Sequence, residues 1–241
     1  MNLEEVLNFR RSVRRYDKNK PIDPEKVKHC LELATLAPNS SNMQLWEFYQ
    51  ITNPGLMAKV SEACLGSRLL LRLRKLLFLL LVRICIKSVL NLCLTLKKEI
   101  SGAIVRKSVR KNVLGTGSCI MVTDAFHLCK VFRASRAFQG DIGENHQPVP
   151  PMMLEVSECD MRVTVNKSCA LAAQTFMIAM ANEGYDTCPL EGFDSRRMKK
   201  LLKLPHGAGI NMVIPCGIRD GNKGIWGERG RVPFDEIYHR I

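Results

Sequence analysis

Four arginines and a serine stand together near the start of the chain, in the string Arg10-Arg11-Ser12-Val13-Arg14-Arg15. A guanidinium group is planar and donates two parallel hydrogen bonds, which suits it to phosphate. Each charge-assisted bond contributes about 1.5–3 kcal/mol where water is excluded. The string therefore predicts a phosphate site, with a solvated basic helix end as the alternative.

Short polar side chains are concentrated between Pro38 and Gln44. Asn39, Ser40 and Asn42 can each donate and accept hydrogen bonds, so they suit the ring edge and the hydroxyl groups of a cofactor. The same residue types are common in ordinary turns. In isolation, the pattern favours a turn.

The string Pro189-Leu190-Glu191-Gly192 lies between an expected strand and an expected helix. Glycine lets the backbone approach a flat ligand closely, and a backbone N–H there could donate to a ring atom. An ordinary strand–helix connection is the alternative interpretation.

A further basic string, Glu228 to Pro233, contains Arg229 and Arg231 in a segment with little periodicity. One of these arginines could reach a phosphate while the other pairs elsewhere. A surface arm is the competing interpretation.

The order, separation and context of these four patterns resemble the nitroreductase family of FMN-dependent oxidoreductases. That family opens with an Arg-x-Ser-x-basic motif and continues with a proline- and serine-containing string that ends in Asn-x-Gln-x-Trp. A Pro-x-Glu-Gly motif follows the long central helix, and a basic-x-Arg-x-Pro motif closes the sequence. The matching residues are Arg10, Ser12, Arg14, Pro38, Ser40, Asn42, Gln44, Trp46, Pro189, Glu191, Gly192, Arg229, Arg231 and Pro233.

The resemblance implies one α+β domain over residues 1–241, with a central, mixed but mainly antiparallel sheet flanked by helices. It implies an intertwined homodimer with FMN at the interface, and electron transfer from NADH or NADPH to nitroaromatic, quinone or similar conjugated acceptors. It also implies a cofactor site made by Arg10, Arg11, Ser12, Arg14, Arg229 and Arg231, by Asn39, Ser40 and Asn42 of the other subunit, and by the backbone of Pro189, Leu190, Glu191 and Gly192.

The elements that position these residues have recognisable starts and ends. We expect helices at a capping box formed by Asn2 and Glu5, at Asp23 followed by proline, and after Asp194. A long helix from Thr164 to Glu183 carries an apolar stripe and ends at a glycine. Strands are expected at 46–52, at 185–188 and at 210–218.

The middle of the chain has a different composition. Leucine is abundant from 67 to about 130, and neither a helical nor a strand period persists. Its longest uncharged apolar run, Leu76 to Val82, is far shorter than the ~20 residues that span a bilayer. Our hypothesis is that about 67–135 was translated from a shifted reading frame, which leaves this segment divergent or poorly ordered.

The net charge of +13 is localised. Between Ser67 and Lys111 there are 12 lysines and arginines and one acid, Glu99, so the rest of the chain carries only +2. Two alternatives to an active enzyme follow: an inactive relic of a flavin-binding fold, or a basic protein that binds nucleic acid or anionic lipid through 67–111. A face built for nucleic acid would spread its charge across the fold, so nucleic acid is not favoured as a partner. A membrane-surface helix would keep its basic residues on one side, which this segment does not, so a membrane is not favoured either.

Ten cysteines are present, none of them in a C-x-x-C pair, and many have apolar neighbours. This indicates buried, reduced thiols rather than disulfides or a metal site. The first residues predict an amphipathic helix rather than a signal peptide, so a cytoplasmic protein is expected. The histidines are scattered, and no residue is assigned a catalytic role.

Overall fold

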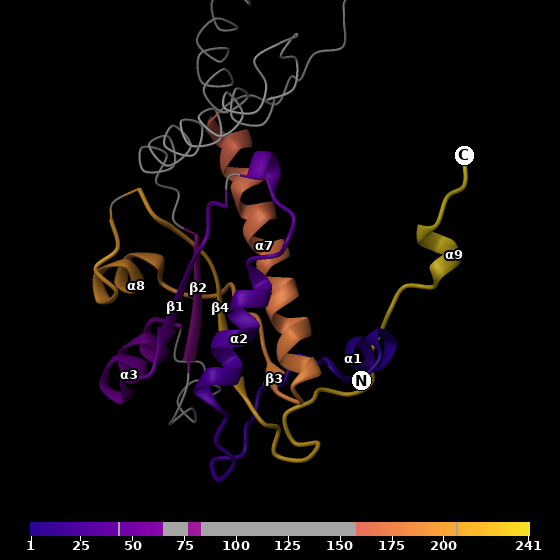
Figure 1. Cartoon of the computed structure of the whole chain (residues 1–241), viewed down its shortest axis with the longest axis horizontal. Helices are drawn as coiled ribbons and strands as arrows, with labels where there is room; N and C mark the ends of the chain where they lie inside the picture. The colour runs from indigo at the N-terminus through magenta and orange to yellow at the C-terminus, as the bar shows by residue number, and fades with distance from the viewer. Residues whose placement is uncertain (43, 65–76, 83–157, 206) are drawn as a thin grey trace, which may run out of the picture.

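The structure is a computed structural model that describes residues 1–42, 44–64, 77–82, 158–205 and 207–241 (Figure 1). Helices and strands alternate irregularly along these ranges, as expected for an α+β fold. The helices are α1 (Leu3–Phe9), α2 (Pro24–Ala34), the short 3-10 helix η1 (Ser40–Asn42), α3 (Pro54–Ala63), α7 (Glu158–Asn182), α8 (Ser195–Leu201) and α9 (Phe234–Ile237), and the strands are β1 (Glu47–Ile51), β2 (Leu77–Val82), β3 (Asp186–Thr187) and β4 (Gly209–Gly217).

Side-chain caps begin the helices at the expected positions. Asn2 Oδ1 accepts from the backbone N–H of Glu5 at 2.8 Å, and the Glu5 carboxylate accepts from the backbone N–H of Asn2. This pair of bonds confirms the capping box. Asp23 caps α2 and Asp194 caps α8, as predicted. Helix α3, which was not expected, begins with the same signal as α2, since Asn53 caps it and a proline follows.

The strands form one sheet in the order β1-β2-β4-β3, and every neighbouring pair is antiparallel. Phe48 lies opposite Leu80, and Leu79 lies opposite Val213, so β2 is bonded on both sides. A single parallel bridge joins Ser12 to Thr187 beside this sheet. The predicted mixed, mainly antiparallel architecture is therefore confirmed.

Strand β4 shows how the sheet separates two layers of helices. Met212 and Ile214 belong to the buried cluster that contains residues of α2 and α7, whereas Val213 belongs to the cluster of α3 and α8. Successive side chains of a strand point to opposite faces, so this alternation gives each face its own core. In Figure 1, α2 and α7 accordingly lie on one side of the strands and α3 and α8 on the other.

Helix α7 is the longest element and supplies much of the larger core. Cys169, Ala173, Phe176 and Met180 are at most 1% exposed, which confirms the predicted apolar stripe. The helix begins at Glu158, six residues before the predicted start. Gly184 follows its end with φ +75°, a conformation that glycine adopts without steric cost.

Part of the leucine-rich middle forms regular structure, although its sequence shows no strand period. Residues 77–82 form a strand between β1 and β4. Its sequence, LFLLLV, is apolar at every position and therefore shows no alternation of polar and apolar residues. The other residues of 67–135, and most of 67–111, lie outside the described part of the chain, so the frame-shift hypothesis stays a prediction. Among the described residues, no helix combines the length and the apolar composition that crossing a bilayer requires.

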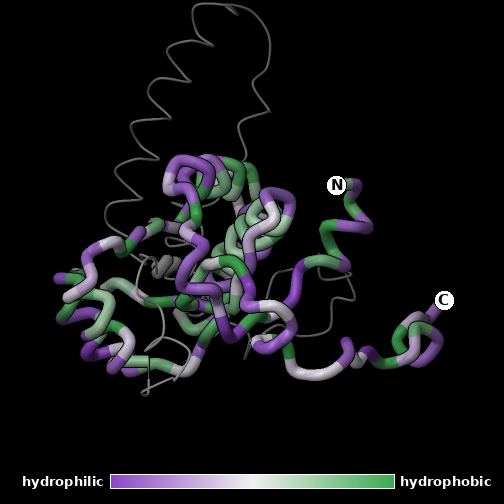
Figure 2. The backbone as a smooth tube through the Cα atoms, turned by 90° about the horizontal axis from the view of Figure 1, so that it is seen from below, coloured by the Kyte–Doolittle hydropathy of each residue, from purple (hydrophilic) through white to green (hydrophobic). Residues whose placement is uncertain are grey.

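The last part of the chain forms an arm that leaves the body of the molecule. Residues 228–241 run away from the core and end beyond the short helix α9, as Figures 1 and 2 show from two directions. Phe234 and Tyr238 stack with ring centroids 5.1 Å apart, yet each is more than half exposed. The arm therefore carries apolar side chains that the described residues of the same chain do not cover.

Candidate functional site

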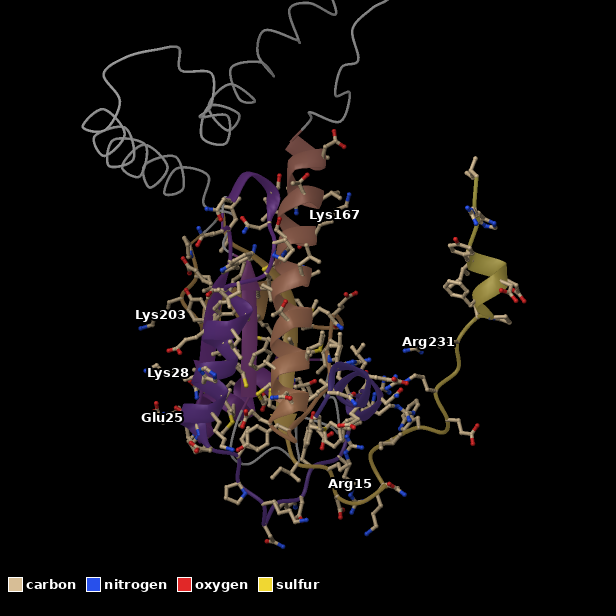
Figure 3. All side chains as sticks on the ribbon, turned by 45° about the vertical axis from the view of Figure 1, so that its right-hand side comes forward. Arg15, Glu25, Lys28, Lys167, Lys203 and Arg231 are labelled. Carbon is tan, nitrogen blue, oxygen red and sulfur yellow. The ribbon has the colours of Figure 1, made fainter. Side chains whose placement is uncertain are left out.

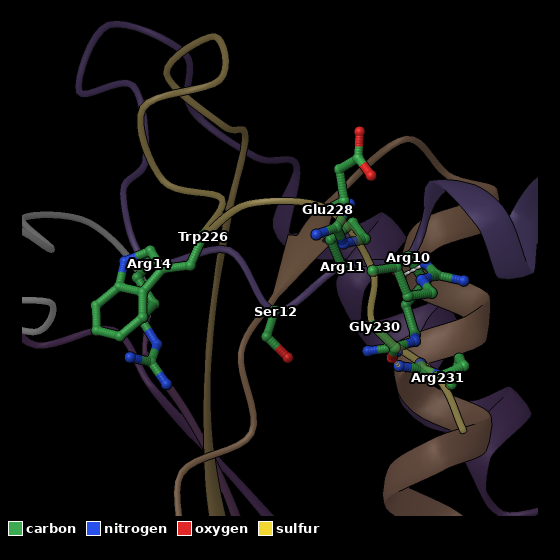
Figure 4. Close-up of a pocket in the computed structure, with 9 residues that line it drawn as sticks. Arg10, Arg11, Ser12, Arg14, Trp226, Glu228, Gly230 and Arg231 are labelled. Atoms are coloured by element: carbon green, nitrogen blue, oxygen red, sulfur yellow. Dashed lines mark hydrogen bonds between the residues drawn. The ribbon is translucent and has the colours of Figure 1, made fainter. Parts of the chain in front are cut away.

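The two ends of the chain enclose a pocket with a volume of about 230 Å³. Figure 4 shows Ser12 between two groups of side chains, with Arg14 and Trp226 on one side and Arg10, Arg11 and Arg231 on the other. The full lining is Arg10, Arg11, Ser12, Arg14, Trp226, Glu228, Arg229, Gly230 and Arg231. The structure thus brings together the predicted N-terminal and C-terminal basic strings.

The N-terminal string lines the pocket because its backbone is bonded on both sides. The N–H of Val13 donates to the carbonyl of Thr187 at 3.1 Å, and the N–H of Arg14 donates to the carbonyl of Gly224 at 2.9 Å. Val13 is fully buried. In an extended segment the residues on either side of it point the opposite way, so Ser12 and Arg14 face the pocket.

The C-terminal side of the pocket approaches the N-terminal string very closely at Gly224. A Cβ atom on this glycine would lie 2.6 Å from the backbone nitrogen of Arg15 and 2.9 Å from its oxygen. A side chain therefore does not fit at this position. Further along, Arg11 donates to the carbonyl of Gly227 at 2.8 Å, which joins the two strings a second time.

The pocket is strongly electropositive. Its lining has five arginines and one acid, Glu228, a net charge of +4. Desolvation, followed by the positive charges of Arg10, Arg231 and Arg11, lowers the pKa of Arg229. None of the ion pairs between described residues involves an arginine of this lining. An anion in the pocket would relieve this repulsion.

Trp226 is a member of the site that the sequence patterns did not single out. The guanidinium carbon of Arg14 lies 4.3 Å from the centre of the Trp226 ring, a cation–π contact, although the tryptophan is 76% exposed. Its occurrence between glycines inside a basic segment was the available signal. The contact limits the directions in which Arg14 can point.

The two arginines of the C-terminal basic string differ in their hydrogen bonds. Arg229 donates to the carbonyls of Leu7, Asn8 and Arg10. Arg231 donates only to the adjacent carbonyl of Gly230 among the described residues. In Figure 3, Arg231 extends from the arm on the side that faces the body of the molecule. Of these two predicted cofactor-binding residues, Arg231 thus has more of its five N–H donors left for an anion than Arg229 has.

The string at 189–192 begins next to the pocket. Thr187, which is bridged to Ser12, precedes Pro189 by two residues. Leu190 exchanges two backbone hydrogen bonds with Val213, at 2.8 and 2.9 Å, so the string runs along β4 away from the pocket. At ~3.3 Å per residue, Glu191 lies about 13 Å along the chain from Thr187. Within one chain, these residues therefore adjoin the pocket but do not line it.

The polar string at 39–42 is not brought to the pocket. It forms η1, where the N–H of Ser40 donates to Ser168 Oγ on α7 at 3.3 Å, and Asn42 accepts from Gln44 at 3.2 Å. In Figure 1, η1 lies by the end of α7 at which that helix begins, whereas α1 lies by the opposite end. Asn39, Ser40 and Asn42 are therefore separate from the arginines in a single copy of the chain.

The described residues contain no cluster of histidine, cysteine or acidic side chains that could hold a metal ion. Their cysteines are free thiols, and burial raises the pKa of Cys188, with the nearby Arg14 guanidinium offsetting part of the rise. The site offers cations, one carboxylate, one hydroxyl and an aromatic ring. This set can hold a phosphorylated ligand and supplies no nucleophile or acid–base pair of its own.

Known proteins share sequence and fold with this chain. The model of the Nitroreductase family matches residues 7–72 and 113–218, which leaves 73–112 unmatched, a shorter interval than the predicted 67–135. YodC of Bacillus subtilis, named as a candidate NAD(P)H nitroreductase, is 25% identical over 216 residues, which cover 90% of this chain and 89% of YodC.

Solved structures share the fold. The candidate nitroreductase ydfN of Bacillus subtilis superposes with a TM-score of 0.72 at 20% identity, covering 99% of this chain and 98% of ydfN. A candidate nitroreductase of Exiguobacterium sibiricum, solved in complex with FMN, gives a TM-score of 0.67 at 18% identity, covering 100% of this chain and 98% of its own.

Proposed function

The chain belongs to the nitroreductase family, and from this premise we propose that it is an FMN-dependent oxidoreductase. Electrons pass from NADH or NADPH to nitroaromatic, quinone or similar conjugated acceptors in two successive half-reactions. The observation that carries the proposal is the pocket where Arg10, Ser12, Arg14 and Arg231 converge without a carboxylate partner among the described residues.

These residues fit a phosphate group. The lining carries a net charge of +4, and the pKa of Arg229 is lowered by desolvation and then by the neighbouring arginines, whose repulsion a dianion would offset. The phosphate oxygens of FMN would accept from Arg10, Arg14 and Arg231. The hydroxyl of Ser12, on a shorter side chain, would add a further donor. FMN, when bound, supplies the acceptance and release of electrons, so the protein needs no catalytic side chain for that step.

The remaining predicted residues have separate roles in this proposal. The backbone of 189–192 begins beside Ser12 and follows β4, which suits the edge of a flat ring extending from the phosphate. The site is then completed by Asn39, Ser40 and Asn42 of a second copy, because these residues are remote from the pocket of their own chain. The exposed apolar residues of the C-terminal arm support the same homodimer. We place this enzyme in the cytoplasm.

The visible absorbance of the purified protein tests the proposal. We expect a flavin spectrum that bleaches when NADH or NADPH is added under anaerobic conditions and recovers when a quinone follows. A folded, colourless protein that does not take up added FMN would contradict it. Binding to nucleic acid or anionic vesicles that weakens steeply with salt would then favour the basic binding protein. Absence of such binding would favour the inactive relic.

A further inference from the structure

The C-terminal end of α1 is bound by arginines that are more than 200 residues away in the sequence. The last carbonyls of a helix have no partner within the helix. Helix α1 has no basic residue in its own last turn. Four successive carbonyls instead accept from two distant guanidinium groups: Leu7, Asn8 and Arg10 from Arg229 at 3.0, 3.1 and 2.6 Å, and Phe9 from Arg219 at 3.0 Å.

Arg219 is itself held firmly. Its backbone N–H and its Nε donate to the carboxylate of Asp186, at 2.7 and 2.9 Å, and that aspartate is 2% exposed. Its guanidinium carbon also lies 4.3 Å from the centre of the Phe9 ring. Through this arginine, the end of α1 is attached to the sheet at β3.

Arg229 makes the corresponding attachment to the arm. Its contacts are directed at backbone oxygens on either side of Phe9, including the carbonyl of Arg10 itself. The backbone that these oxygens belong to leads directly into the pocket, since Ser12 follows two residues later. Moving Arg229 would therefore move the start of the phosphate-binding string, whereas moving Arg231 would not.

We propose that Arg229 is a positioning residue, which fixes Arg10 and Ser12 for the phosphate, rather than a phosphate ligand. This differs from the role that the family resemblance implies for it, and it rests on the proposed FMN function. Three of the five N–H groups of the guanidinium donate to the carbonyls of Leu7, Asn8 and Arg10, so its fork is directed at the protein. Its charge still contributes to the positive field of the pocket.

Hydrogen exchange in flavin-free protein tests the positioning role. The N–H of Arg10 donates to Val6, and that of Arg14 donates to Gly224, each at 2.9 Å. In the Arg229→Ala variant, both amides should exchange on the order of ten-fold faster, because charge-assisted bonds that hold this backbone are lost. Arg229→Lys keeps the charge but has a single ammonium group as donor. Its Arg10 and Arg14 amides should exchange at rates between those of Arg229→Ala and the original protein.

Arg231→Ala is the matched control, two residues along the same arm. Its guanidinium contacts only the Gly230 carbonyl among the described residues, so the Arg10 and Arg14 amides should exchange at the original rate. Equal exchange in Arg229→Ala, Arg231→Ala and the original protein would overturn the proposal. If Arg229→Ala does not fold, the Arg229→Lys comparison decides in the same way.

A double-mutant cycle on FMN affinity provides the second readout. If Arg229 acts through Arg10, then Arg229→Ala should weaken FMN binding about ten-fold in the original protein and less than three-fold when Arg10→Ala is already present. An equal loss in both backgrounds would show that Arg229 binds the phosphate itself. The exchange experiment uses no flavin, so its result stands apart from the proposed function. If the protein takes up no FMN at all, the cycle rejects the proposed function and leaves the exchange test intact.

Discussion

The carboxylate of Asp186 accepts hydrogen bonds from both the backbone and the side chain of Arg219. The aspartate side chain is 1% exposed and that of the arginine is 23% exposed, so water contributes little to either charge. Such a pair gives modest net stability while intact, but removing one charge leaves the other desolvated and unpaired.

Asp186→Asn should therefore lower the free energy of unfolding by about 3 kcal/mol. Urea unfolding followed by circular dichroism measures this. Asp220→Asn is the control, because its pair with Arg15 at 2.9 Å has side chains that are 34% and 41% exposed. Exposed pairs contribute about 0–1 kcal/mol. Equal losses in the two variants would show that burial does not govern the Asp186 pair.

Gly224→Ala should separate the two ends of the chain. The added Cβ would lie 2.6 Å from the backbone nitrogen of Arg15, an atom that cannot rotate away. We expect a loss of about 1–3 kcal/mol of stability and weaker flavin binding, measured by thermal unfolding and by fluorescence titration with FMN. At Gly230 an added Cβ meets nothing within 4 Å and φ is not positive, so Gly230→Ala should unfold at the original temperature. Unchanged stability in Gly224→Ala would contradict the close approach.

Replacing Arg14 and Arg231 together with alanine should release flavin. Each arginine would provide charge-assisted bonds of about 1.5–3 kcal/mol to the phosphate, and a loss of 1.4 kcal/mol is a ten-fold change in affinity. Equilibrium dialysis against FMN measures the loss. Riboflavin lacks the phosphate, so its weaker binding should change much less. A double variant that keeps stoichiometric FMN would place the phosphate elsewhere.

Alkaline pH should destabilise the protein through its buried thiols. Burial raises the pKa of Cys30 and of Cys64 from 9.0 to about 11, and that of Cys169 to about 12. Above pH 9 the unfolded chain loses these protons while the folded chain keeps them, so stability falls as pH rises toward 11 and this contribution is constant below pH 9. The slope reaches about 1.4 kcal/mol per pH unit for each thiol.

Urea midpoints at several values between pH 8 and pH 11 test this. Cys169→Ala should reduce the slope, since the unfolded chain then has one fewer group to titrate. Midpoints that do not change up to pH 11, or a slope that the substitution leaves unaltered, would show that these thiols are solvated in the native protein.

The mass in solution should be twice that of one chain. Light scattering should give about double the 27.2 kDa of a single copy. Leu171 on α7 and Phe234 and Ile237 on the arm are 46–67% exposed in one copy, and burying such side chains drives association. A 27.2 kDa particle that still carries flavin would contradict a site shared between two subunits.

Local signals explain how much could be predicted from the sequence. The starts of three helices were predicted from their caps, Asn2, Asp23 and Asp194, because a cap depends only on residues three or fewer positions away. The stripe of α7 and the strand β4 were predicted for the same reason, since their periodicities are local. Two of the four motifs, the basic strings near the two ends of the chain, lie on the two halves of the pocket.

The features that were missed depend on contacts between distant segments. Strand β2 is identified by its pairing with β1 and β4, because its uniformly apolar residues show no period that sequence alone could detect. The partner of Arg229 is a helix end 219–222 residues earlier, and nothing near Arg229 indicates it. Likewise, the contact of Trp226 with Arg14 exists only after the two ends of the chain have met.

The contact between Arg11 and Gly227 joins residues 216 positions apart. A ribosome adds ~5–20 residues each second, so about 10–40 s separate the synthesis of the two halves of the pocket. During that interval the nascent chain carries its first basic string without the segment that completes it. Under the proposed function, FMN would be bound only after translation of the carboxyl-terminal arm, and a polypeptide stalled before that point would leave the ribosome without it.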